Sequence, residues 1–240
     1  MRVGYQVILL VCVTAGIAGC NSIKNSGKYN FADGYYKSNV FHDASSKVYV
    51  DNSDDSIYVY ELDKKGKVIL SSPEEKIHLS FPQEYSLTAV KAHNYRRRSF
   101  DFDFLTIPFK YRPSIGSFPN QFNTNLSGAL YMGFRNDIYH LVYRQTPLNK
   151  YQKRLTRYGF SIGLFTGIGG TAMNPWVTNN QVFSEYDGVV WMKGVSGIFA
   201  VDNFALGFCV GWDDLLDPNR QYWIYEQKAW LGLAFGISIN

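Results

Sequence analysis

The sequence predicts an all-β protein in which a small antiparallel up-and-down β-barrel of about eight strands follows a small β-rich module. Aromatic residues make up 17% of the 240-residue chain and there are 21 glycines, a composition that suits pleated strands better than a helical bundle. Apolar residues alternate with small or polar ones along most of the second half, with the period of two that is typical of strands. Long and short connections alternate between these runs along the chain.

The N-terminal segment has the pattern of an export signal. Arg2 precedes a short apolar run at 7–13, and small residues at 15–19 lead to Cys20. This order is that of a secretory signal peptide, and the apolar run is shorter than the ~20 residues that a transmembrane helix needs. We therefore predict that residues 1–19 are a signal peptide.

The end of this segment, Ile17-Ala18-Gly19-Cys20, resembles the lipobox of bacterial lipoproteins. The resemblance implies that Cys20 becomes the acylated N-terminus of the mature chain, with palmitate-like chains anchoring it in a membrane. Asn21 fits sorting of such a lipoprotein to the outer membrane. Residues 20–29 are polar and are expected to form a tether.

Residues 30–98 are expected to form the small β-rich module. Strand-like runs at 47–51 and 56–60 flank a turn-forming segment, Asp51–Asp55, which predicts a hairpin. A second turn is expected at 64–67, before an apolar stretch at 68–70, and residues 78–81 are a candidate short strand.

The barrel is expected to span residues 99–240. Phe100, Phe102 and Phe104 alternate with aspartates, and Leu105, Ile107, Phe109 and Tyr111 then continue the apolar row after a slip of one residue. Such a slip predicts a β-bulge between positions 104 and 105, and Pro108 suits a bulged strand.

The later runs alternate more strictly. Residues 158–164, 204–212 and 231–239 each place large apolar side chains on one face and small residues on the other. A water-soluble barrel would need charged residues on its outer face, and these runs contain none. We therefore expect the apolar rows to face lipid and the small residues to face a narrow interior.

Eight strands are predicted, at 99–112, 122–135, 138–145, 156–170, 176–184, 188–201, 204–213 and 228–240. On this count the long connections at 113–121, 146–155 and 214–227 lie at one barrel end, and tight turns at Asn136-Asp137 and Asp202-Asn203 lie at the other. Outer-membrane barrels have this asymmetry, and the long loops are the expected surface for a protein partner.

Five charged residues fall on the inward faces: Asp101, Asp103, Lys110, Arg112 and Arg135. We expect these opposite charges to meet in the interior, where they would form a charge cluster. Eight strands leave room only for side chains, so the sequence predicts a filled barrel rather than an open pore.

The sequence gives little support for nucleic-acid binding, a cofactor, catalysis or a metal site. The net charge of +4 and the lack of a continuous basic face argue against nucleic acid, and we predict no cofactor and no catalytic residue. The acidic loop at Asp213, Asp214, Asp217 and Asn219 does not have the spacing of an EF-hand, so no metal site is predicted. Cys209 has no partner for a disulfide and is expected to be a packed small residue.

The stretches 104–114, 158–170 and 230–240 resemble outer-membrane β-barrel proteins of Gram-negative bacteria, an uncharacterised group. The resemblance implies a fold and a location in the cell outer membrane. The leading interpretation is a lipid-anchored barrel with a structural, adhesive or accessory role. Two alternatives remain: a tethered soluble barrel or sandwich, similar to a lipocalin, that binds an apolar ligand, and a barrel enzyme acting on membrane lipid through His140 and a serine.

Overall fold

The structure, a computed structural model, describes residues 31–69, 78–116, 118–202 and 204–238. The predicted signal peptide, Cys20 and the tether at 20–29 lie outside these residues. The prediction of an all-β, antiparallel, up-and-down fold is confirmed. Within the described residues, no helix has both the length and the apolar character that crossing a membrane would require.

The chain forms two compact units. In the described part of the chain, the first takes residues 31–69, 78–89 and 144–153, and the second takes 90–143 and 154–238. The first unit contains β1 (Gly34–Ser38), β2 (Ser46–Asn52), β3 (Ser56–Glu61) and β4 (His78–Pro82), which pair in this order. The short β5 (Tyr85–Ser86) pairs with Tyr151 and Gln152.

The core of the first unit lies on one face of this sheet. Alternate residues of β2 and β3, Val48, Val50, Ile57 and Val59, are fully buried, as is Tyr36. The predicted hairpin between the 47–51 and 56–60 runs is confirmed. The predicted turn at 64–67 is also present, with Gly66 at φ 81° and its N–H donating to the carbonyl of Asp63.

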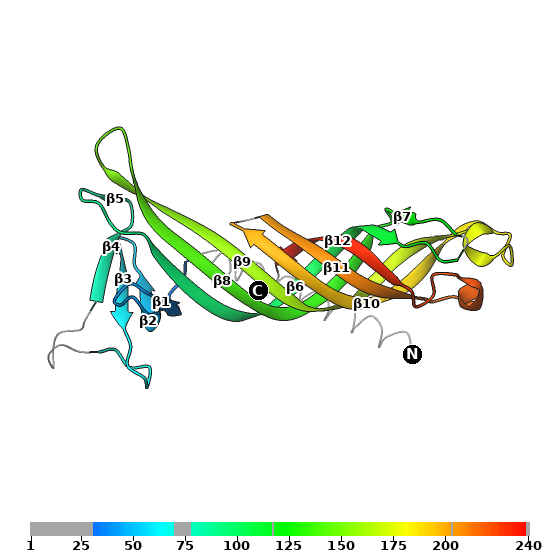
Figure 1. The fold of residues 1–240 in the computed structure, drawn as a ribbon, viewed down its shortest axis with the longest axis horizontal. Coiled ribbons are helices and arrows are strands. Elements are labelled where there is room, and N and C mark those ends of the chain that lie inside the picture. Colours follow the sequence, from blue (N-terminus) through cyan, green and yellow to red (C-terminus); the bar gives the residue numbers. More distant parts are fainter. Residues whose placement is uncertain (1–30, 70–77, 117, 203, 239–240) are drawn as a thin grey trace, which may run out of the picture. The chain divides into compact units, whose positions relative to one another are not determined.

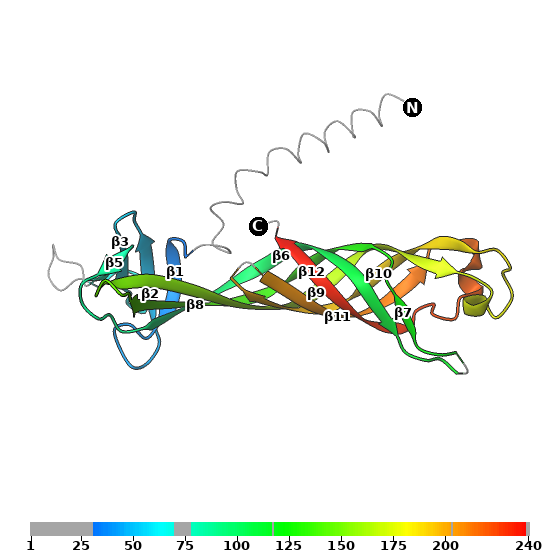
Figure 2. The same cartoon turned by 90° about the horizontal axis from the view of Figure 1, so that it is seen from above.

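The second unit is a ring of six long strands (Figures 1 and 2). These are β6 (His93–Arg112), β8 (Ser127–Gln145), β9 (Tyr151–Met173), β10 (Tyr186–Val201), β11 (Phe204–Leu215) and β12 (Ala229–Ser238). The last two residues of β8 and the first three of β9 belong to the first unit. Neighbours in the chain pair antiparallel, and β12 returns to pair with β6. The short β7 (Gln121–Asn123) pairs with the end of β6.

The ring has six long strands rather than about eight, because one predicted turn does not exist and one predicted strand is absent. Asn136-Asp137 is not a turn: β8 runs through it, and the Asp137 side chain points inward to accept from the Nε of Arg135 at 2.9 Å. An Asn-Asp pair forms turns readily, but here a buried ion pair holds the aspartate in an extended strand.

The predicted strand at 176–184 is also absent. It is replaced by η1, a short 3₁₀ helix at Trp176–Thr178, followed by a loop with left-handed residues at Asn179 and Asn180. The connection expected at 146–155 shrinks to 146–150, and these residues belong to the first unit rather than to the barrel. The long connections at one end are therefore 113–120, 174–185 and 216–228, the last of which contains η2 (Pro218–Tyr222).

The β-bulge lies further along β6 than predicted. Against β12, Leu233 pairs with Phe109 and Phe235 pairs with Thr106, so β6 carries one extra residue between these two pairs. Leu105 and Ile107 consequently continue the inward row of Asp101 and Asp103, and both are fully buried rather than facing outward. Pro108, which has no N–H to donate to a ladder, occupies the irregular stretch.

The ring is narrow enough that inward glycines touch neighbouring strands. A Cβ added at Gly163 would lie 2.5 Å from the Cα of Gly133 and closer still to the carbonyl oxygen of Met132, both on β8. Gly194 on β10 has the same relation to Gly211 on β11. Backbone cannot move aside as a side chain can, so these positions accept no larger residue without distorting the ring.

We expect Gly163→Ala to destabilise the barrel by about 1–3 kcal/mol, the usual cost of overpacking. Gly197→Ala is the matched control, because a Cβ at Gly197 would meet nothing within 4 Å. Urea unfolding of the two variants, followed by tryptophan fluorescence, measures the difference. Equal stability of the two variants would contradict the close approach of β8 and β9.

Candidate functional site

The outer surface of the six-stranded ring carries a belt of exposed apolar side chains. Phe204 and Phe208 on β11 are 62% and 63% exposed, so the large residues of this strand point outward as the alternation predicts. Each of the other strands contributes to the belt. Its exposed members include Phe100, Phe104, Met132, Phe134, Phe160, Leu164, Phe199, Val210 and Leu231.

The belt has the extent of a lipid bilayer's apolar layer. Its row on β9 covers residues 158–168, which is 11 positions, and a tilted strand needs about 9–11 residues to cross a bilayer. No residue of 158–168, 195–201 or 204–212 is charged. An exposed apolar surface of this size is rare on a soluble monomer and marks a surface that something apolar covers.

Charged groups return to the outer face at the end that carries the long loops. Lys193 on β10 donates to the Oδ2 of Asp214 at 2.8 Å and lies 4.9 Å from the ring centroid of Trp191. Asp214 also accepts from Arg220 and Gln227 of the 216–228 connection. A tryptophan beside a paired lysine is typical of the boundary between an apolar layer and water.

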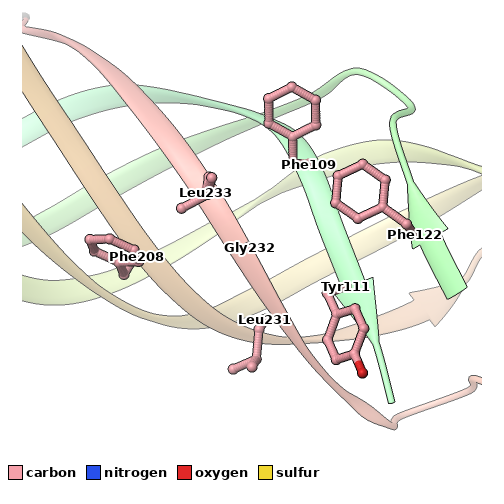
Figure 3. Close-up of a pocket in the computed structure, with 7 residues that line it drawn as sticks. All are labelled: Phe109, Tyr111, Phe122, Phe208, Leu231, Gly232 and Leu233. Atoms are coloured by element: carbon pink, nitrogen blue, oxygen red, sulfur yellow. The ribbon is translucent and has the colours of Figure 1, made fainter. Parts of the chain in front are cut away.

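Within the belt, a shallow hollow of about 160 Å³ lies over β6, β7, β11 and β12 (Figure 3). The rings of Phe109 and Phe122 stack beside it, with centroids 5.7 Å apart. Its lining is almost entirely apolar and consists of Phe109, Tyr111, Phe122, Phe208, Leu231, Gly232 and Leu233. The hollow is thus part of the same apolar surface.

Inside the ring, at the end with the long loops, two predicted residues meet an unpredicted one. The guanidinium of Arg112 donates to the Oδ2 of Asp213 at 2.6 Å, and the Nζ of Lys110 lies 3.2 Å from the same oxygen. The three side chains are at most 2% exposed. Two cations and one carboxylate leave this buried group with one formal positive charge.

Other side chains complete the surroundings of this group. The indole N–H of Trp230 donates to the Oδ1 of Asp213 at 2.7 Å, and Arg112 donates to the hydroxyl of Thr171 at 3.1 Å. The Arg112 guanidinium also lies 5.1 Å from the ring centroid of Trp223 and 5.3 Å from that of Tyr225. Arg112 thus links the barrel wall to the loop that follows η2.

A second group of buried charges lies toward the opposite end. Arg135 contacts Asp137 at 2.9 Å and Asp101 at 3.6 Å, and Asp103 acts on Arg135 electrostatically. Arg157 approaches Asp137 at 3.7 Å and donates to the carbonyl of Asp202 in the β10–β11 turn. The five predicted residues are therefore all buried, but they belong to two separate groups rather than one.

Apolar side chains fill the space between the two charged groups. Leu105, Ile107, Tyr131, Phe165, Met192 and Trp230 are all buried in one cluster. The Tyr131 hydroxyl lies 2.7 Å from the Oγ of Ser161, so its polar end is also satisfied. This arrangement gives the barrel a packed interior.

The buried charged and aromatic residues that the sequence interpretation missed lie in the same inward-facing rows as the residues that it identified. Asp213 continues the inward series of Ala205, Gly207, Cys209 and Gly211, and Trp230 precedes the inward Gly232. Extending each alternating row by one more residue would have placed both side chains in the interior. Asp137 and Arg157 were missed because one was assigned to a turn and the other to a strand end.

The residues considered for other chemistry have different partners. Asp213 and Asp214 bind cations on opposite sides of β11, and Asp217 accepts from the hydroxyl of Tyr186 at 2.9 Å. Across the described residues, no group of three or more histidine, cysteine or acidic side chains is placed to hold a metal ion. His140 lies 2.7 Å from the side-chain oxygen of Asn94, and the buried Cys209 donates to Ser196.

Comparison with known proteins gives no further indication of identity. No protein family, no curated protein and no solved structure matches this chain.

Proposed function

We propose that the chain is a lipid-anchored β-barrel protein of the cell outer membrane, with a structural, adhesive or accessory role rather than a catalytic one. The observation that carries this proposal is the outward direction of the belt, with Phe204 and Phe208 exposed while Cys209 and Ala234 are buried. A ring of strands can cross a bilayer because each backbone N–H and C=O pairs with a neighbouring strand.

The ends of the strands support an orientation. The start of β6 and the end of β12 lie at the same end of the ring, since these two strands pair antiparallel. The tight turn at Asp202 is at that end as well, and the three long connections are at the other. In outer-membrane barrels short turns face the periplasm and long loops face outward, so the N-terminal anchor at Cys20 would reach the inner leaflet.

The long loops are the proposed contact surface for a protein partner. They are 113–120, 174–185 and 216–228. Two contacts hold the last of these to the barrel: the Arg112 guanidinium lies against the ring of Tyr225, and Arg220 binds Asp214 on β11. Loops on a rigid scaffold are common positions for binding residues.

Cleavage of the tether tests membrane insertion. A protease site placed in residues 22–29 separates the acylated Cys20 from the rest of the chain. We expect the cleaved protein to stay in the membrane fraction through a high-pH carbonate wash, because the belt holds it there independently of the acyl chains. Release of the cleaved protein into the soluble fraction would refute insertion and favour a tethered soluble domain.

A further inference from the structure

The long connections of the second unit enclose a second pocket, of about 190 Å³, that the proposed function does not use. Its walls come from residues 118–121, from Asn174 and η1, and from the segment after η2. Three aromatic rings line it, Phe118, Trp176 and Tyr225, together with three side-chain amides, Asn120, Gln121 and Asn174. Sites for drug-sized ligands are larger, about 300–1,000 Å³, so this pocket suits a smaller molecule.

The three amides use their oxygen atoms within the protein. The side-chain oxygen of Asn120 accepts from the backbone N–H of Ser114 at 2.8 Å, and that of Asn174 accepts from the N–H of Val177 at 3.2 Å. The Gln121 oxygen accepts from the guanidinium of Arg112 at 3.2 Å. Backbone N–H and guanidinium groups can only donate, so these contacts determine which end of each amide is the oxygen.

The opposite ends of the amides are NH₂ groups, which are donors. Among the described residues, no acceptor is in hydrogen-bonding position for these three NH₂ groups. Burial raises the pKa of Tyr225, with Arg112 partly offsetting this, so its phenol also stays a potential donor at neutral pH. The polar groups of the pocket thus favour a ligand that brings acceptors.

The charge next to the pocket points the same way. Arg112 touches two of the lining residues, through its hydrogen bond to Gln121 and its position 5.3 Å from the ring of Tyr225. The buried group of Arg112, Lys110 and Asp213 has one formal positive charge. Hydrogen bonds to an ionised acceptor are stronger than those between neutral groups, and a positive charge in a partly enclosed site attracts anions.

We propose that this pocket binds a small carboxylate with a planar apolar body, such as an aromatic acid. The carboxylate oxygens accept from the amide NH₂ groups, and the apolar body packs against the rings. Trp176 and Phe118, whose centroids are 6.4 Å apart in an edge-to-face arrangement, offer such walls. The proposal concerns the barrel unit alone and does not depend on where the protein resides.

Benzoate and its neutral counterpart benzamide test the charge requirement. The full chain, purified in a non-ionic detergent, is titrated with each by calorimetry and by tryptophan fluorescence. We expect saturable one-to-one binding of benzoate and binding of benzamide that is weaker by about tenfold or more. Equal binding of the two, or no saturable binding of benzoate, would overturn the proposal.

Isosteric variants test the amide donors. Asn174→Asp and Gln121→Glu each keep the oxygen that accepts within the protein and replace the NH₂ donor by an anionic oxygen. We expect benzoate to bind each variant about tenfold more weakly or worse. Asn180→Asp is the control: it lies in the loop that follows η1, is exposed, does not line the pocket and has a left-handed backbone that Asp tolerates.

The control and the pocket variants must differ for the proposal to stand. Benzoate binding that is unchanged in Asn174→Asp and Gln121→Glu, or equally weakened in Asn180→Asp, would assign the binding to another site. Because the measurement is made in detergent, a failure of membrane insertion leaves its result unchanged. The two proposals can therefore fail separately.

Discussion

Replacement of Leu164 by arginine is expected to destabilise the barrel in lipid vesicles by about 2–4 kcal/mol, the cost of placing a charge on the lipid face near the bilayer midplane. Leu164 is 64% exposed and lies in the middle of the outward row of β9. On a water-soluble protein the same substitution at an exposed position changes stability little, within about 0.5 kcal/mol. The result therefore separates a lipid-facing belt from a solvent-facing one.

Val189→Arg is the matched control for depth. Val189 also points outward, on β10, but it lies near the loop end of its strand, three residues after the strand begins. A charge near the membrane interface costs about 0–1 kcal/mol. Equilibrium urea unfolding of both variants in vesicles, followed by tryptophan fluorescence, gives the two values. A small and equal effect in both variants would contradict the proposed depth of the belt.

Replacement of Asp213 by asparagine is expected to cost about 3–5 kcal/mol of stability. Asp213 is fully buried and is the anion that Lys110 and Arg112 share, so its neutral isostere leaves two buried cations without a counter-charge. The indole N–H of Trp230 keeps an acceptor in the asparagine oxygen. The expected loss is therefore mainly electrostatic rather than a loss of packing or of a hydrogen bond.

A control and a compensating variant give this prediction its specificity. Asp187→Asn changes an exposed aspartate on β10 at the same barrel end and is expected to stay within about 0.5 kcal/mol of the parent protein. Adding Lys110→Met to Asp213→Asn removes one of the two unpaired cations and is expected to restore part of the loss. Protection of the buried Cys209 from a maleimide reagent reports folding in each variant. A stability of Asp213→Asn equal to that of Asp187→Asn would contradict the buried ion group.

The sequence predicted the outward and inward faces of most barrel strands, because a strand's side chains alternate regardless of its partners. Phe160 and Ser161 of β9, or Phe208 and Cys209 of β11, could be assigned to opposite faces from their neighbours alone. The same reasoning failed on β6. Leu105 and Ile107 look like the continuation of either row, and only pairing with β12 locates the extra residue beyond them.

The buried charges were predicted in part for a similar reason. Position in an alternating row shows that Lys110 and Arg135 point inward, but it does not show what they meet. Their partners come from different places: Arg135 binds Asp137 two residues along its own strand, and Lys110 binds Asp213, 103 residues away. The number of strands between two such residues has to be known before they can be paired.

The sequence by itself determined that this chain is built from antiparallel strands with one apolar and one small or polar face, since period and composition act locally on each segment. Only the tertiary structure decided that six strands close the ring, that Asp137 lies within a strand, and that Asp213 lies between Lys110 and Arg112. These features depend on contacts between distant segments. A local preference such as the turn tendency of Asn136-Asp137 is overridden when this stretch of β8 pairs with β6 and Arg157 of β9 approaches the aspartate.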